Sequence, residues 1–126
     1  MSIPFSAKVV TFICTFDRER SKAFYGGILG FPQTHEDDSA VVFNLHGTML
    51  RVSEAPDFKP AEHTVLGWKV ADIVETVKAL RQKGVKFNFY EGFGQDELDI
   101  WTAPGGATRV AWFEDPDGNV LSLTQS

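Results

Sequence analysis

The chain has very little cysteine. Cys14 is the single cysteine among 126 residues. A disulfide within the chain needs two cysteines, so none can form, and this usage favours a reducing, cytoplasmic compartment. Because Cys14 lies within an apolar run, we interpret it as a small buried hydrophobic residue.

Long apolar runs and an apolar leader are also missing. The longest run, residues 9–16, is far shorter than the roughly 20 residues that cross a bilayer as a helix. Residues 1–7 lack the basic start and long apolar stretch of a secretory signal. We therefore expect a cytoplasmic protein with no membrane partner.

Basic residues do not cluster. The net charge is −5, and Arg18, Arg20 and Lys22 are interrupted by Asp17 and Glu19. Binding to nucleic acid needs a clustered basic face. Nucleic acid is therefore excluded as an expected partner.

Two common catalytic motifs are absent from the sequence. There is no Gly-x-Ser-x-Gly, so no Ser-His-Asp arrangement can be inferred. "GGATR" at residues 105–109 has glycines, but neither the spacing nor the following helix of a phosphate-binding loop. The catalytic residues, if there are any, stay unknown at this stage.

What the sequence does have is material for a core. Hydrophobic residues make up 43% and aromatic residues 13% of the chain. These fractions exclude disorder, and the length suits one domain, residues 1–126.

The first half of the chain predicts one helix among several strands. Asp17 offers an N-cap, Phe24 and Ile28 share one helical face, and Gly30 can end the helix. The predicted elements are a strand at 8–16, a helix at 18–29, a weak short strand at 33–38, and two strands within 40–52 around His46-Gly47.

The second half repeats this order after a linker with two prolines, residues 55–62. Asp72 begins a helix with a start that resembles a capping box, and Gly84 ends it. The predicted strands lie at 64–70, 85–90, 109–114 and 119–125.

The two halves therefore form an internal repeat. Asp72 corresponds to Asp17 at the start of each helix, and Gly118 corresponds to Gly47 in the last turn of each half. The glycines lie further apart in the sequence than the aspartates, which indicates an insertion within residues 91–108. Each half has the order strand, helix, three strands, and one such unit cannot bury both faces of its sheet alone.

Three segments resemble one known superfamily. "FDRERSKAFYGGILGF", with Asp17, Phe24-Tyr25 and Leu29-Gly30-Phe31, is similar to the opening of a vicinal-oxygen-chelate module. "FEDPDGNVLSLTQ" resembles its closing hairpin, and "WKVADIVETVKALRQKGVKF" resembles the start of its second module. The chain is thus similar to the superfamily of glyoxalase I, bleomycin-resistance proteins and extradiol dioxygenases.

The resemblance implies an α+β fold of two βαβββ modules forming a cup-shaped, mostly antiparallel sheet. Module one would cover about residues 7–54 and module two about residues 63–126, joined by the linker. Members of this length commonly pair, so the resemblance also implies a homodimer.

In metal-using members, four side chains inside the cup bind a divalent ion. The resemblance puts these positions at Val10, Arg51, Val65 and Ser122. Valine has no donor atom, arginine is always cationic, and a lone serine hydroxyl is a weak ligand. We therefore expect no metal and no cofactor.

Strand alternation within the implied cup predicts a ligand site instead. The expected ligand is a small organic molecule, either anionic or aromatic. Arg51 could clamp an anion, or could pair with Glu54 or Glu62 on the surface. The predicted ligand-binding residues are Phe12, Arg51, His63, Lys69, Trp101 and Ser122.

His63 has a second interpretation, as a residue at the end of the linker.

The insertion at 91–108 also has two interpretations. Phe93 and Trp101 could close over the cup as a lid, or pack on the helix of module two or on a partner subunit. Trp112 is interpreted as a core or dimer contact.

The leading functional hypothesis is a metal-independent small-molecule binding protein. The alternative is a lyase, isomerase or dioxygenase-like enzyme, either with displaced metal ligands or using His63, Lys69 or Arg51 in acid–base chemistry. A third hypothesis is a scaffold or regulatory domain without a ligand.

Overall fold

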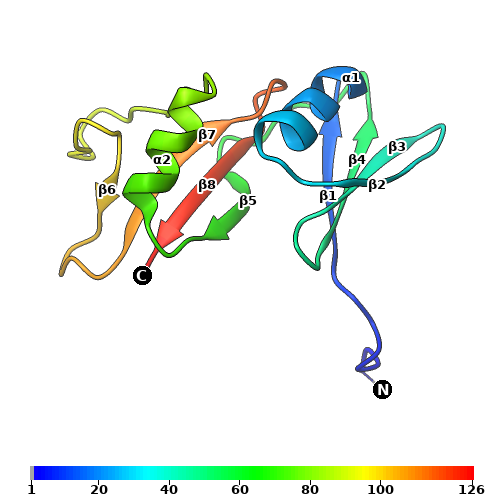
Figure 1. Cartoon of the computed structure of the whole chain (residues 1–126), viewed down its shortest axis with the longest axis horizontal. Coiled ribbons are helices and arrows are strands. Elements are labelled where there is room, and N and C mark those ends of the chain that lie inside the picture. The colour runs from blue at the N-terminus through cyan, green and yellow to red at the C-terminus, as the bar shows by residue number, and fades with distance from the viewer. Residues whose placement is uncertain (1) are drawn as a thin grey trace. The chain divides into compact units, whose positions relative to one another are not determined.

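The computed structural model describes residues 2–126 and has an α+β fold. The chain forms two compact units, the first ending at Phe58 and the second beginning at Lys59. Both units have the predicted βαβββ order (Figure 1). That residues 1–126 form a single domain stays a prediction.

The first unit contains one mixed sheet with the strand order β1-β4-β3-β2. β1 and β4 pair in parallel, and the two other pairings are antiparallel. The elements are β1 (Val10–Thr15), α1 (Arg18–Ser21), η1 (Lys22–Ile28), β2 (Gln33–Glu36), β3 (Ala40–Asn44) and β4 (Met49–Glu54).

The helical segment of the first unit begins and ends where the sequence predicts. The Asp17 carboxylate accepts hydrogen bonds from the backbone N–H groups of Glu19 and Arg20. Gly30 follows the segment with a φ of 81°, which glycine adopts without strain. The interior differs from the prediction, because Lys22–Ile28 is a π-helix rather than an α-helix.

The core of the first unit lies between this helical segment and one face of the sheet. Tyr25 is fully buried, and its ring lies 5.9 Å from that of Phe43 on β3. Leu50 and Val52 on β4 are also fully buried. Since side chains alternate along a strand, Met49 and Arg51 lie on the opposite face.

The second unit repeats the sheet, with the strand order β5-β8-β7-β6. β5 and β8 pair in parallel, and the other pairings are antiparallel. The elements are β5 (Thr64–Lys69), α2 (Ile73–Gln82), β6 (Trp101–Thr102), β7 (Arg109–Glu114) and β8 (Val120–Gln125).

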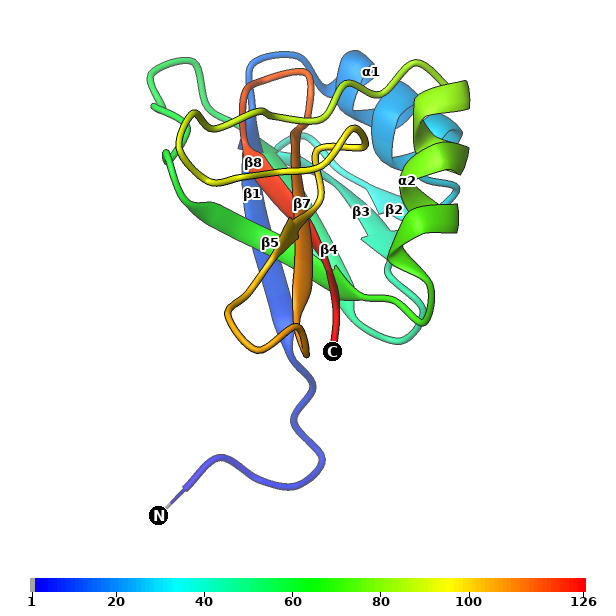
Figure 2. The same cartoon turned by 90° about the vertical axis from the view of Figure 1, so that its left-hand side faces the viewer.

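Helix α2 covers one face of the second sheet (Figure 2). The Asp72 carboxylate caps the helix by accepting from the backbone N–H of Glu75 at 3.1 Å. Ile73 and Val77 of α2, and Ala111 and Phe113 of β7, are buried. The face that α2 leaves uncovered carries Trp112 and Ser122, and we call it the helix-free face.

One predicted strand of the second unit is wrong. Residues 85–90 contain only an isolated bridge, from Phe87 to Phe113. Val85 and Phe87 are buried there as packing residues. The first of the three strands that follow α2 is instead the short β6, within the insertion.

The register of strand pairing follows the internal repeat. Phe12 lies opposite Arg51 in the first sheet, and Gly67 lies opposite Ser122 in the second. The two pairs are equivalent in the repeat, which relates Phe12 to Gly67 and Arg51 to Ser122. The repeat breaks at a bulge between Thr64 and Leu66, so that Val65 has no opposite residue.

No helix in the described part of the chain is both long and apolar enough to cross a membrane.

Candidate functional site

Ser122 lies at the centre of the helix-free face of the second sheet. Its neighbours across the strands are Gly67 on β5 and Trp112 on β7. Ser122 is only 7% exposed. A Cβ atom at position 67 would lie 2.6 Å from the Ser122 Oγ, so the absence of a side chain at Gly67 makes the space for this hydroxyl.

Four aromatic rings gather on the same face around Trp112. We call Tyr90, Phe93, Trp101 and Trp112 the aromatic cluster. The ring centroid of Trp112 lies 5.5 Å from Tyr90, 5.9 Å from Phe93 and 6.1 Å from Trp101. Phe93 is 49% exposed and the three other residues are half-buried, so the cluster presents ring surface to solvent.

Gln95 holds the loop that carries Tyr90 and Phe93. Its Oε1 accepts from the backbone N–H of Tyr90 at 2.6 Å. Its Nε2 donates to the carbonyl oxygens of Asn88 at 2.9 Å and Asp99 at 2.8 Å. One side chain thus fixes three points of the loop backbone.

Asp96 and Ile100 anchor the end of this loop. The Asp96 Oδ1 accepts from the backbone N–H groups of Leu98 and Ile100, both at 2.9 Å. The Ile100 side chain is fully buried, and Asp99 pairs with Arg81 of α2 at 2.9 Å. Tyr90 and Phe93 are therefore carried on a braced loop, while Trp101 and Trp112 are held by strands β6 and β7.

A pocket of about 610 Å³ adjoins the aromatic cluster. Tyr90 lines this pocket and is also a member of the aromatic cluster. Glu62 and Glu114 supply two carboxylates, and none of the described lining residues is Lys, Arg or His. The Asn88 amide donates to the Tyr90 hydroxyl at 3.0 Å and to Glu114 at 3.2 Å. This end of the face favours neutral or cationic groups over anions.

Arg51 lies in the first unit and already has an anionic partner there. Its guanidinium lies 3.1 Å from Asp37, rather than pairing with either predicted glutamate. The backbone N–H of Ser39 and the Arg51 guanidinium hold the pKa of Asp37 well below its usual range. Phe12, opposite Arg51, is 67% exposed.

The other predicted residues lie in the second unit. Trp101 and Ser122 are both on its sheet, and Trp101 lies in the aromatic cluster beside Trp112, the strand neighbour of Ser122.

Lys69 is exposed at the end of β5, and His63 is exposed one residue before β5 begins. The bulge at Val65 breaks the alternation that was expected to align His63 with Gly67.

Sequence reasoning did not select Tyr90 or Trp112 as site residues. Trp112 could have been found, because the turn at residues 115–119 fixes the β7–β8 register and puts Trp112 opposite Ser122. Tyr90 had no such signal, since it lies outside the strands. Cys14, predicted to be buried, is only half-buried.

The four positions that would hold a metal do not fit one. Val10 and Val65 have no donor atom, and the Arg51 cation is paired with Asp37. Within residues 2–126, no three or more His, Cys, Asp or Glu side chains are grouped so that they could hold a metal ion. The donor chemistry at these positions thus disagrees with a divalent site.

The chain was compared with protein-family models and with curated proteins. The model of the Glyoxalase/Bleomycin resistance protein/Dioxygenase superfamily matches residues 8–123. A search of curated proteins gives no match.

Solved structures with the same fold cover nearly the whole chain. A glyoxalase family protein from Bacillus anthracis has a TM-score of 0.75 at 16% identity, covering 100% of this chain and 99% of that one. A superfamily member from Sphaerobacter thermophilus has a TM-score of 0.73 at 22% identity, with 97% and 98% covered. TnmS3, an antibiotic binding protein from Streptomyces sp. CB03234, has a TM-score of 0.71 at 21% identity, with 98% of both chains covered.

Proposed function

Since the chain belongs to the Glyoxalase/Bleomycin resistance protein/Dioxygenase superfamily, we propose that it binds a small aromatic molecule without using a metal ion. The binding surface is the helix-free face of the second sheet. Trp101 and Trp112 stack on the ligand, and Ser122 supplies a hydroxyl beside them.

The observation that carries this proposal is the aromatic cluster. Exposed ring surface is costly in water and is typical of sites that bind ligands. Flat rings held by two strands and a braced loop can stack on a flat ligand with little loss of conformational entropy. The carboxylates of Glu62 and Glu114 beside Tyr90 favour a neutral or cationic ligand here.

The metal-free part of the proposal rests on donor chemistry. Val10, Arg51, Val65 and Ser122 cannot together satisfy a divalent ion. Binding alone needs no catalytic group, and TnmS3 is an antibiotic binding protein with the same fold. The alternative, an enzyme using acid–base chemistry, needs a substrate positioned against a titratable side chain such as His63.

Titration with 2-naphthol and with cyclohexylmethanol tests the proposal, following tryptophan fluorescence and the melting temperature. We expect 2-naphthol to quench the fluorescence and raise the melting temperature, while the non-aromatic alcohol does neither. Phe93→Leu and Trp101→Leu should each weaken 2-naphthol binding about five- to tenfold, because each removes one ring.

Phe5→Leu is the matched control, because Phe5 is exposed in the first unit and belongs to no part of this face. Equal binding of both alcohols, or equal loss in Phe5→Leu and Phe93→Leu, would contradict the proposal. A broad library in which no compound stabilises the protein would support the scaffold hypothesis.

Metal analysis of the purified protein separates binding from the enzymatic alternative. We expect less than stoichiometric Zn, Ni, Mn and Fe, and 2-naphthol binding that chelators leave unchanged. A stoichiometric metal, together with an activity that chelation removes, would overturn the metal-free proposal.

A further inference from the structure

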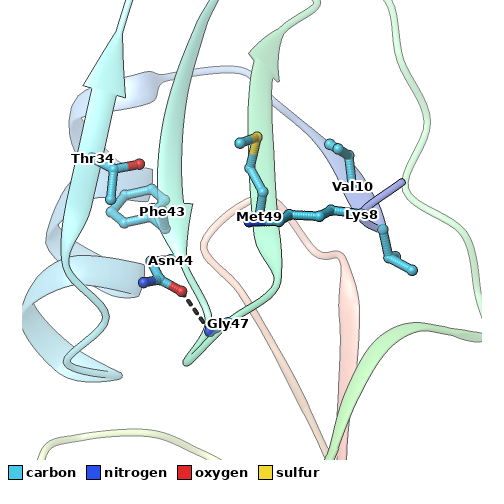
Figure 3. A pocket seen from close by; sticks show the side chains of 8 residues that line it. Lys8, Val10, Thr34, Phe43, Asn44, Gly47 and Met49 are labelled. Carbon is cyan, nitrogen blue, oxygen red and sulfur yellow. Dashed lines mark hydrogen bonds between the residues drawn. The ribbon is translucent and has the colours of Figure 1, made fainter. Parts of the chain in front are cut away.

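The first unit contains a separate pocket of about 320 Å³. Side chains from β1, β2, β3 and β4 surround it near the β3–β4 turn (Figure 3). The described lining residues are Lys8, Val9, Val10, Thr34, Phe43, Asn44, Gly47 and Met49. All belong to the first unit, so none is shared with the proposed aromatic site.

Lys8 supplies the charge of this pocket. Its side chain extends in the direction of Met49 (Figure 3). The ammonium forms no ion pair with any described residue, and no described lining residue is Asp or Glu. The pocket therefore carries a positive charge that nothing within the described part of the first unit neutralises.

Asn44 supplies polar donors next to this charge. Its Oδ1 accepts from the backbone N–H of Gly47 at 2.6 Å, which fixes the orientation of the amide (Figure 3). The Nδ2 donors have no partner in the described part of the chain. An anion beside Lys8 would gain a second donor from this amide.

The remaining wall of the pocket is apolar. Val10 and Met49 lie opposite each other on β1 and β4, and they are 39% and 46% exposed. Phe43 also lines the pocket. Such a wall suits a short hydrocarbon or a single aromatic ring, and the volume is at the lower end of small-molecule sites.

We propose that this pocket binds a small carboxylate with an apolar body, with the carboxylate on Lys8 and Asn44 and the body against Val10 and Met49. The class follows from one unpaired cation and one amide beside an apolar wall. The site goes beyond the proposed function and does not depend on it.

Binding of phenylacetate and of its neutral counterpart phenylacetamide, followed by calorimetry and by backbone amide NMR, tests the inference. We expect phenylacetate to bind about fivefold more tightly than phenylacetamide, and to shift the amide resonances of Asn44 and Gly47. Lys8→Met should remove this preference, and Lys8→Arg should keep it. Asn44→Asp keeps the acceptor for Gly47 but adds a negative charge, so it should abolish phenylacetate binding.

Lys78→Met is the matched control, because Lys78 is an exposed lysine on α2. Equal affinity for phenylacetate and phenylacetamide would overturn the proposal, as would an unchanged preference in Lys8→Met. Equal binding of inorganic phosphate would overturn the requirement for an apolar body. Resonance shifts confined to the second unit would show that phenylacetate binds elsewhere.

Discussion

At the scale of single residues, Gly67 determines how β5 can lie against β8. A Cβ atom there would lie 2.6 Å from the Ser122 Oγ and 3.2 Å from the Ser122 carbonyl oxygen. A Cβ atom essentially never lies as close as 2.6 Å to another heavy atom outside its own residue and chain neighbours. The serine is therefore buried beside a glycine because no larger residue fits opposite it.

Gly67→Ala should lower the free energy of unfolding by about 1–3 kcal/mol, as expected for overpacking. Ser122→Ala in the same chain should restore part of this loss, because it removes the Oγ but leaves the carbonyl contact. Urea unfolding of both single variants and the double variant measures the coupling.

Gly27→Ala is the control for backbone effects, because nothing lies within 4 Å of a Cβ built at Gly27. If Gly67→Ala is no less stable than Gly27→Ala, the close approach of Gly67 and Ser122 is wrong.

Asp37 connects the turn between β2 and β3 to β4. Its Oδ1 accepts from the backbone N–H groups of Ser39 and Ala40, both at 2.9 Å, and its Oδ2 lies 3.1 Å from Arg51. These contacts lower the pKa of Asp37 below its ordinary value of 3.8. The contribution to stability is present above that value and is lost as the pH falls toward the folded-state pKa.

Asp37→Asn should therefore lower stability at neutral pH and flatten the loss of stability between neutral pH and strong acid. Urea unfolding midpoints measured across this pH range give the slope of stability against pH. Asp57→Asn, which removes an exposed carboxylate from the linker, should leave the slope as in the unmodified chain. An unchanged slope in Asp37→Asn would contradict the assignment.

The predictions made for single residues succeed where the alternation of side chains along a strand is enough to place them. Alternation predicts that Ser122 and the buried Leu121 point to opposite faces. It does not predict the partner of Arg51, because Asp37 is brought close by the turn between β2 and β3. Contacts made through turns depend on backbone geometry that residue types alone do not determine.

At the scale of elements, the loop before β6 is organised around one glutamine. Gln95 bonds to the backbone of Asn88 and Tyr90, in the segment where a strand was predicted. The buried Val85 and Phe87 explain why this segment has the composition of a strand. The alternation of apolar residues in this segment shows that these side chains are buried. It does not show whether the segment pairs with a neighbouring strand.

Gln95→Ala should increase hydrogen exchange at the Tyr90 amide, because it removes the acceptor of that N–H. The fluorescence of Trp112 should also change as the aromatic cluster loosens. Gln82→Ala, at the exposed end of α2, is the control. Unchanged protection at Tyr90 would mean that the loop is held by other contacts.

The π-helix at Lys22–Ile28 is the second feature that the sequence does not predict. The spacing of Phe24 and Ile28 fits an ordinary helix, and the cap residues on both sides are as expected. Periodicity over so short a segment cannot separate hydrogen bonds to the fourth residue from those to the fifth. The helix ends are therefore predictable here, but the winding between them is not.

At the scale of the whole molecule, two units share one topology but differ in their uncovered faces. The first sheet exposes Phe12, Val10 and Met49, while the second carries the aromatic cluster. The internal repeat predicted the shared order of elements. The insertion contributes Phe93 and Trp101 to this difference and has no counterpart in the first half.

We predict that the protein is a homodimer, because exposed apolar side chains such as Phe12 favour association. Light scattering after size-exclusion chromatography should give twice the mass of one chain. Phe12→Lys should shift the equilibrium toward the monomer, whereas Phe5→Lys, also at an exposed phenylalanine, should not. A monomer across the micromolar range would contradict this prediction.

The parallel pairing of the first and last strand in each unit has a consequence for biosynthesis. β4 and β8 each lie between two other strands, yet each is the last strand of its unit to leave the ribosome. The first unit can close its sheet once Glu54 has emerged, whereas β5 must wait for β8. During translation, the strand that carries Gly67 thus stays without its partner until almost all of the second unit has been synthesised, and an unpaired strand edge of this kind is prone to aggregation in that interval.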